Sequence, residues 1–163
     1  SGAEEDTEFF RTIEILRVQS GKRTRRRLNR IKGHITKIDS AAGISLVDVI
    51  TGAGILTVLI LDTPKSLSYL KETHPVYLLF KETEVALGLP ELGKVSYSNV
   101  MNGIVEDVVF GELLVEVTIA AEKEKIKSII TERAYRYLGI AKGKAVKWIT
   151  KADEIAFEVP VRD

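Results

Sequence analysis

The sequence predicts an all-β protein with short helices, in which two tandem small β-barrels follow an N-terminal helix. Short runs of β-branched residues, broken by glycine and aspartate, fill the chain from Ile31 onward, and such runs favour strands. The same order of elements also occurs twice along the chain, as in repeat architectures. The 163 residues accommodate both units, and units of roughly 60 to 70 residues with short strands and one helical turn fit small barrels.

The internal repeat places matching residues 70 positions apart. The clearest pairs are Asn29 with Asn99, Gly33 with Gly103, Ile35 with Val105, Ile60 with Ile130, Val76 with Val146, and Lys81 with Lys151. Between these anchors the best match falls to a separation of 68, as for Val47 with Val115, which predicts a two-residue length difference in a hairpin. We therefore divide the chain into an N-terminal helix and basic linker (1–25), a first barrel (26–90) and a second barrel (94–160).

Residues 4–18 are predicted to form the N-terminal helix. Acidic residues occupy its start, where the helix dipole favours them, and an apolar stripe follows at helical spacing, formed by Phe9, Phe10, Ile13 and Leu16. This stripe is too small to stabilise an isolated helix, so we expect it to pack on the body, on a partner chain or on a missing domain. A start without methionine favours a fragment, so an N-terminal domain would lie outside this chain.

The order of elements is the same in both units. Strands are predicted in the first unit over residues 35–38, 44–50, 55–61 and 76–80. Asp62 followed by Pro64 has the order that begins a helix, so a brief helix is expected there. In the second unit Thr131 is expected to cap a helix that runs through Tyr137 and ends in a turn at Gly139.

Composition argues against an enzyme. Lys and Arg number 24 against 23 Asp and Glu, so the net charge of +1 gives no strong field toward nucleic acid or membrane. Without cysteine the chain has no cysteine nucleophile and no thiolate zinc site, and with two histidines it has little material for histidine-based chemistry. Glu82 and Glu84 have the alternate spacing of a solvated strand face, and no phosphate-binding glycine motif is present. We expect a non-enzymatic protein without metal cation or organic cofactor, in the cytoplasm and not at a membrane.

A basic run from Lys22 to Lys32 is the one strong charge asymmetry. Three interpretations remain open: a solvated linker, a nucleic-acid clamp, or part of an anion site. A clamp usually adds exposed aromatic side chains that stack on bases. The candidate aromatic residues instead lie within apolar strand runs, where core packing is expected: Tyr77, Phe80, Phe110 and Trp148.

The second unit offers a donor set for a tetrahedral dianion, which needs several neutral donors and one or two cations around it. Ser96, Ser98 and Asn99 supply hydroxyl and amide groups just before a strand, Thr131 stands at a helix start, and Lys151 ends a strand. Each residue also has an ordinary structural explanation, such as a turn or a helix cap.

Three segments resemble the tandem Mop or TOBE oxyanion-binding modules, and more closely the C-terminal sensing half of a ModE-type molybdate-responsive transcriptional regulator. Residues 96–104 (SYSNVMNGI) are similar to the family loop S-A-R-N-x-x-x-G-x-V, residues 130–143 to I-T-x-x-A…L-G-L-x-x-G, and Lys151-Ala152 to a terminal K-A. In the first unit Asn29 and Lys81 keep the family asparagine and lysine. The loop arginine of the family is replaced by Leu28 in the first unit and by Ser98 in the second.

The resemblance implies two five-stranded OB-like barrels per chain and a homodimer. Molybdate or tungstate would be held where the loop of one barrel meets the threonine and lysine of another. The better site is expected at Ser96, Ser98, Asn99, Thr131 and Lys151, and a weaker one at Arg26, Asn29 and Lys81. A sensor domain of a transcriptional regulator is the first expectation, with DNA bound only by a domain outside this chain. A molybdate storage protein, the barrel region of an importer ATPase, and an OB-type nucleic-acid binder using Lys22 to Lys32 are the alternatives.

Overall fold

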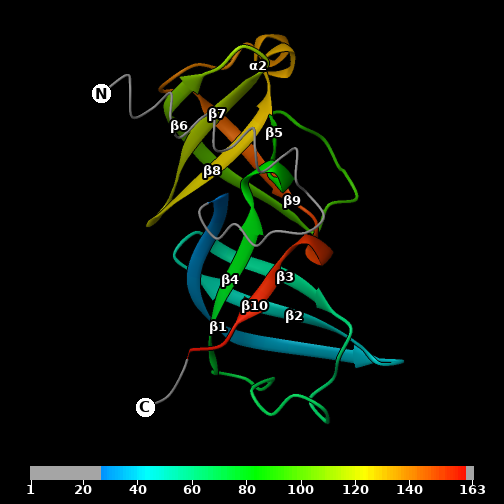
Figure 1. Cartoon of the computed structure of the whole chain (residues 1–163). Helices are drawn as coiled ribbons and strands as arrows, with labels where there is room; N and C mark the ends of the chain where they lie inside the picture. The colour runs from blue at the N-terminus through cyan, green and yellow to red at the C-terminus, as the bar shows by residue number, and fades with distance from the viewer. Residues whose placement is uncertain (1–26, 161–163) are drawn as a thin grey trace.

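A computed structural model describes residues 27–160 of the protein, so the predicted N-terminal helix and Arg26 lie outside the described residues. This part of the chain forms two curled five-stranded sheets, one above the other (Figure 1). All strand pairings are antiparallel. The predicted all-β architecture is therefore confirmed for residues 27–160.

The strands follow the predicted order in each half. The first half contains β1 (Leu28–Ala41), β2 (Ile44–Thr51), β3 (Gly54–Ile60), β4 (Pro75–Lys81), the 3-10 helix η2 (Glu82–Glu84) and β5 (Ala86–Gly88). The second contains β6 (Asn99–Phe110), β7 (Leu114–Ala121), β8 (Glu124–Thr131), α2 (Glu132–Leu138), β9 (Ala145–Thr150), the 3-10 helix η3 (Ala152–Glu154) and β10 (Ala156–Glu158).

The repeat holds a separation of 70 throughout the described strands. The long strands β1 and β6 carry a bulge at the same place, after Ile35 and after Val105. Ile35 lies opposite Val49, and Val105 lies opposite Ile119, so the predicted slip to a separation of 68 is wrong. Strand side chains alternate with a period of two, so a shift of two residues keeps every apolar residue on the same face and the sequence match cannot detect it.

The two sheets exchange their fifth strands. β5 comes from the first half but pairs with β9, and β10 comes from the second half but pairs with β4 (Figure 1). The predicted ranges 26–90 and 94–160 therefore each contribute a short strand to the other sheet. The repeat could not predict this exchange, because each three-residue strand follows its 3-10 helix in the same order whichever sheet it joins.

An ion pair fastens β10 to the first sheet. Arg30 Nε lies 2.9 Å from Glu158 Oε1, and its guanidinium lies 3.6 Å from the ring centroid of Tyr77. The hydrogen bond to Glu158 is the main reason that the pKa of Arg30 is raised. This residue of the basic run thus has a structural role at the sheet surface.

The core runs through both sheets, and aromatic residues join them. Phe80 and Trp148 are fully buried and stack with ring centroids 6.2 Å apart. The expectation of core packing is confirmed for these two residues and wrong for Phe110, which is 58% exposed and meets Tyr135 edge to face. Phe110 is the last residue of β6, and its ring meets Tyr135 of α2 at the surface and not the core.

The helix predictions have different outcomes in the two halves. Thr131 caps α2 by accepting a hydrogen bond from the Ala134 backbone N–H at 3.0 Å, and Gly139 ends it with φ of 65°. The brief helix expected after Asp62 is absent from the described chain, where turns occupy this loop. The Ser66 hydroxyl donates to Asp62 Oδ1 at 2.8 Å, and this side-chain bond closes a turn in place of a helix.

Candidate functional site

Two asparagine side chains connect the two sheets through hydrogen bonds to backbone groups. Asn29 on β1 donates from Nδ2 to the Lys127 carbonyl (2.9 Å) and accepts from the Lys127 N–H (2.8 Å) on β8. Asn99 on β6 makes the same pair of bonds with Thr57 on β3, at 2.9 and 2.7 Å. We call these contact regions the first seam, at Asn29, and the second seam, at Asn99. Since β3 and β8 are edge strands, each amide satisfies backbone groups that no neighbouring strand reaches.

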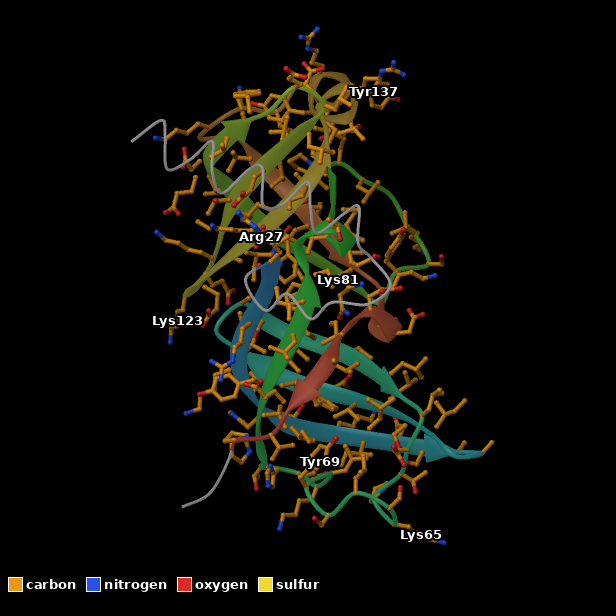
Figure 2. The ribbon with its side chains drawn as sticks, in the orientation of Figure 1. Arg27, Lys65, Tyr69, Lys81, Lys123 and Tyr137 are labelled. Atoms are coloured by element: carbon orange, nitrogen blue, oxygen red, sulfur yellow. The ribbon has the colours of Figure 1, made fainter. Side chains whose placement is uncertain are left out.

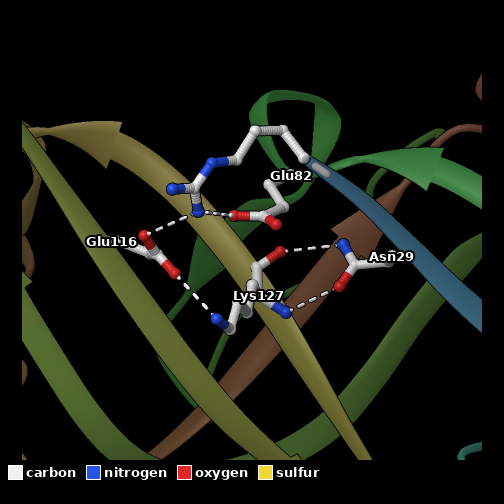
Figure 3. A network of polar contacts seen from close by, with 5 residues as sticks. Asn29, Glu82, Glu116 and Lys127 are labelled. Atoms are coloured by element: carbon white, nitrogen blue, oxygen red, sulfur yellow. Dashed lines mark hydrogen bonds and ion pairs between the residues drawn. The ribbon is translucent and has the colours of Figure 1, made fainter. Parts of the chain in front are cut away.

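The first seam contains a network of four charges, of which three are buried and Lys127 is partly exposed (Figure 3). Arg27 Nη1 lies 3.3 Å from Glu116 Oε2 and 3.7 Å from Glu82 Oε1, and Lys127 Nζ lies 3.1 Å from Glu116 Oε1. Arg27, Glu82 and Glu116 are all buried. The expectation that Glu82 lies on a solvated strand face is wrong, because Glu82 begins a 3-10 helix that turns inward against β8.

The second seam carries no charge at the four equivalent positions. Counted at the repeat separation of 70, the counterparts of the four charged residues are Tyr97, Ala152, Leu46 and Thr57. Leu46 is 44% exposed where Glu116 is 6% exposed, and Tyr97 is 39% exposed where Arg27 is 5% exposed. The second seam is thus the more open of the two and has neither of the buried carboxylates.

Three of the predicted site residues come together at the second seam. Asn99 lies opposite Thr150 in the β6–β9 pairing, which brings Ser98 beside Lys151. Ser98 and Lys151 are exposed, as is Ser96 two positions upstream. This end of the second sheet therefore presents hydroxyl groups and an ammonium group to solvent.

Thr131 lies away from this cluster. It pairs with Leu114 at the α2 end of the sheet, beside the last residue of β6, whereas Asn99 is the first residue of β6. Figure 2 shows Tyr137 of α2 at the far end of the second sheet and Arg27 and Lys81 between the sheets. The Thr131 hydroxyl also accepts the capping bond of α2. One chain alone does not bring Thr131 to Lys151.

The first seam brings Asn29 and Lys81 together, since Lys81 lies opposite Leu28, next to Asn29. Glu82 follows Lys81 directly, and both Glu82 and Glu116 are buried there. Arg27, which the sequence places in a basic run, is engaged with these carboxylates. Arg27 and Lys127 are paired with these carboxylates, so these cations are not available to hold a dianion at this seam.

The sequence did not predict the buried ion pairs of Arg27 and Glu82. A signal exists in the repeat, because a buried charge pair replaces Tyr97 and Ala152 at two positions that the fold brings together. In residues 27–160, three or more histidine, aspartate or glutamate side chains nowhere gather as a metal site, and no helix there is long and apolar enough to cross a membrane.

Two curled five-stranded sheets, related by an internal repeat and joined by exchanged strands, define a tandem small-barrel protein. Among solved structures the chain is similar to the cytoplasmic molybdate-binding protein ModG in a crystal form with molybdate bound. The TM-score is 0.75 with 27% sequence identity, over 81% of this chain and 96% of that chain. No family model and no curated protein sequence matches the chain. The similarity to ModG agrees with the OB-like barrels expected from the sequence.

Proposed function

We propose that the protein binds a tetrahedral oxyanion, molybdate or tungstate, without catalysing a reaction. The observation that carries this proposal is the similarity to ModG, a molybdate-binding protein, across 96% of the ModG chain. The anion takes the place of a cofactor, and no metal cation is required to hold it. We also propose a cytoplasmic location, with the same similarity in support.

The second seam is the favoured anion site. Ser96, Ser98 and Lys151 are exposed around its open end, and hydroxyl donors with one ammonium group suit a tetrahedral dianion. The four positions equivalent to the charged residues of the first seam hold no carboxylate. The first seam, to which the sequence assigns Arg26, Asn29 and Lys81, is accordingly the weaker or lost site, and Asn29 is not proposed as a ligand because its amide is bonded to the Lys127 backbone.

A homodimer would complete this site, because Thr131 and Lys151 of one chain lie apart. Support comes from an exposed aliphatic face on the first sheet, formed by Ile44, Leu46, Ile50, Ile55 and Leu61. The equivalent face of the second sheet carries Glu116, Lys125 and Thr131 in place of Leu46, Ile55 and Leu61. The fold therefore does not require aliphatic residues there, and an interface explains them.

Replacing Ile55 with lysine, the residue that the second sheet has at this position, is expected to convert a dimer into a monomer. A lysine in the interface would have to lose its water shell without a partner. Light scattering at micromolar concentration measures the change in mass. Ile104→Lys is the control, because Ile104 is 51% exposed but lies on β6, outside this face. A wild-type monomer, or equal effects of both variants, would contradict the proposed interface.

Lys151→Ala is expected to remove the stabilisation of the fold by molybdate, and Lys81→Ala to leave most of it. An anion at 100 times its dissociation constant stabilises a native state by about 2.7 kcal/mol, which thermal unfolding with and without molybdate measures. Both lysines are exposed at equivalent strand ends, Lys81 as the last residue of β4 and Lys151 directly after β9, so their effects on the empty protein should be similar. The opposite ranking of the two variants would place the site at the first seam.

A sensor domain of a ModE-type transcriptional regulator is the finer form of this proposal, with DNA contacted by a domain outside this chain. Molybdate storage and an importer ATPase region are alternatives with the same ligand. A nucleic-acid clamp through Lys22 to Lys32 is the alternative of another class, although Arg27 and Arg30 are engaged in ion pairs. Binding through such a clamp would weaken steeply as salt rises, whereas an enclosed dianion site would not follow that dependence.

A further inference from the structure

We infer that Asn99 is a positioning residue for the oxyanion site and not one of its ligands. This inference rests on the proposed function and assigns Asn99 a task different from the one that its sequence motif suggests. The amide fixes the beginning of β6, and with it Ser98, to the edge strand β3 of the other sheet. The anion affinity of the second sheet then depends on a contact with the first sheet.

The hydrogen bonds of Asn99 engage both polar atoms of its side chain. Its Oδ1 accepts the Thr57 N–H at 2.7 Å and its Nδ2 donates to the Thr57 carbonyl at 2.9 Å. The side chain is 1% exposed, so both bonds form away from water, where replacing them is costly. The second N–H of Nδ2 is buried with the side chain, so an anion would reach it only by opening this contact.

The location of Asn99 connects its hydrogen bonds with Thr57 to the anion site. Ser98 precedes it, and its cross-strand partner Thr150 precedes Lys151. Ser98 and Lys151 are exposed, so neither residue is held in place by burial. The pairing of β6 with β9 brings the two residues together, and the bonds between Asn99 and Thr57 fix this end of the pairing against β3 of the other sheet.

The repeat supplies a matched control. Asn29 makes the same two bonds, at 2.8 and 2.9 Å, with Lys127 on the opposite edge strand, and it is 6% exposed. Removing either amide therefore disturbs the sheet contact to a similar degree. Only the amide of Asn99 adjoins Ser98 and Lys151.

The test is calorimetric titration with molybdate of the wild type, Asn99→Ala and Asn29→Ala, together with their thermal unfolding. Both variants should lower the unfolding temperature by similar amounts. The dissociation constant should rise at least tenfold in Asn99→Ala and less than threefold in Asn29→Ala. Equal changes in affinity, or no change in Asn99→Ala, would overturn the positioning role. If Asn99→Ala does not fold, Asn99→Ser takes its place with the same expectations.

Thr57→Pro separates positioning from direct ligation. Proline removes the N–H that Asn99 accepts, and because that group points to the free edge of β3, the pairing with β2 remains. A positioning role predicts at least a fivefold rise in the dissociation constant although Asn99 is intact. An unchanged affinity would show that Asn99 acts as a ligand and overturn the inference. Absence of oxyanion binding by the wild type would overturn the proposed function itself, which is a separate result.

Discussion

Replacing Arg27 with alanine is expected to lower the free energy of unfolding by about 3 to 5 kcal/mol. The change removes the cation that contacts both buried carboxylates, Glu82 and Glu116, and among the described residues Lys127 remains beside Glu116. A buried charge that loses its partner keeps the full cost of its desolvation. Urea denaturation monitored by the fluorescence of Trp148, which lies in the core, measures the loss.

Lys37→Ala is the control for this prediction. Lys37 and Asp39 form an ion pair at 3.4 Å in which both side chains are 64% exposed, and such pairs contribute about 1 kcal/mol or less. A loss below about 1 kcal/mol in Arg27→Ala as well would mean that water reaches the network. The first seam would then be open to solvent, as the second seam is.

Gly33→Ala is expected to cost about 3 kcal/mol of stability, the upper end for overpacking a core. A Cβ at this position would lie 2.5 Å from the Ile50 carbonyl oxygen and 2.7 Å from Val49 Cγ1. A backbone oxygen cannot swing aside as a flexible side chain does, so β1 and β2 would have to separate. Thermal or urea unfolding gives the difference from the wild type.

Gly93→Ala serves as the comparison, because a Cβ there meets no atom within 4 Å. Its effect should stay within about 0.5 kcal/mol, as for most surface substitutions. Gly103 is the repeat counterpart of Gly33, and a Cβ there would also collide with a neighbouring strand. A neutral Gly33→Ala would show that the close approach of β1 and β2 is not needed for the fold.

The fold could be predicted from the sequence largely because the repeat constrains it. Glycines 33 and 103 mark the same close approach in each sheet, and Thr131 and Gly139 bound α2 as expected. The exchange of β5 and β10 could not be predicted, since three residues have too little pattern to select a partner sheet.

The candidate site was predictable only in part. The motif brings Ser98, Asn99 and Lys151 to one strand end, as the β6–β9 pairing requires. Whether Asn99 is a ligand or a positioning residue depends on the backbone that lies beside it. That backbone belongs to Thr57, 42 positions away in the sequence. The burial of Glu82 depends on contacts with the other sheet in the same way, and such contacts leave no periodic trace in the sequence.

Oxyanion binding is tested most directly by calorimetric titration of the purified chain with molybdate, tungstate and sulfate in turn, at low salt. We predict saturable binding of at least one of these tetrahedral anions. Fivefold higher potassium chloride should change the affinity far less than it would for a clamp that neutralises several phosphates. Absence of saturable binding for all three anions at millimolar concentration would contradict the account, leaving two barrels that share the fold of ModG without its ligand.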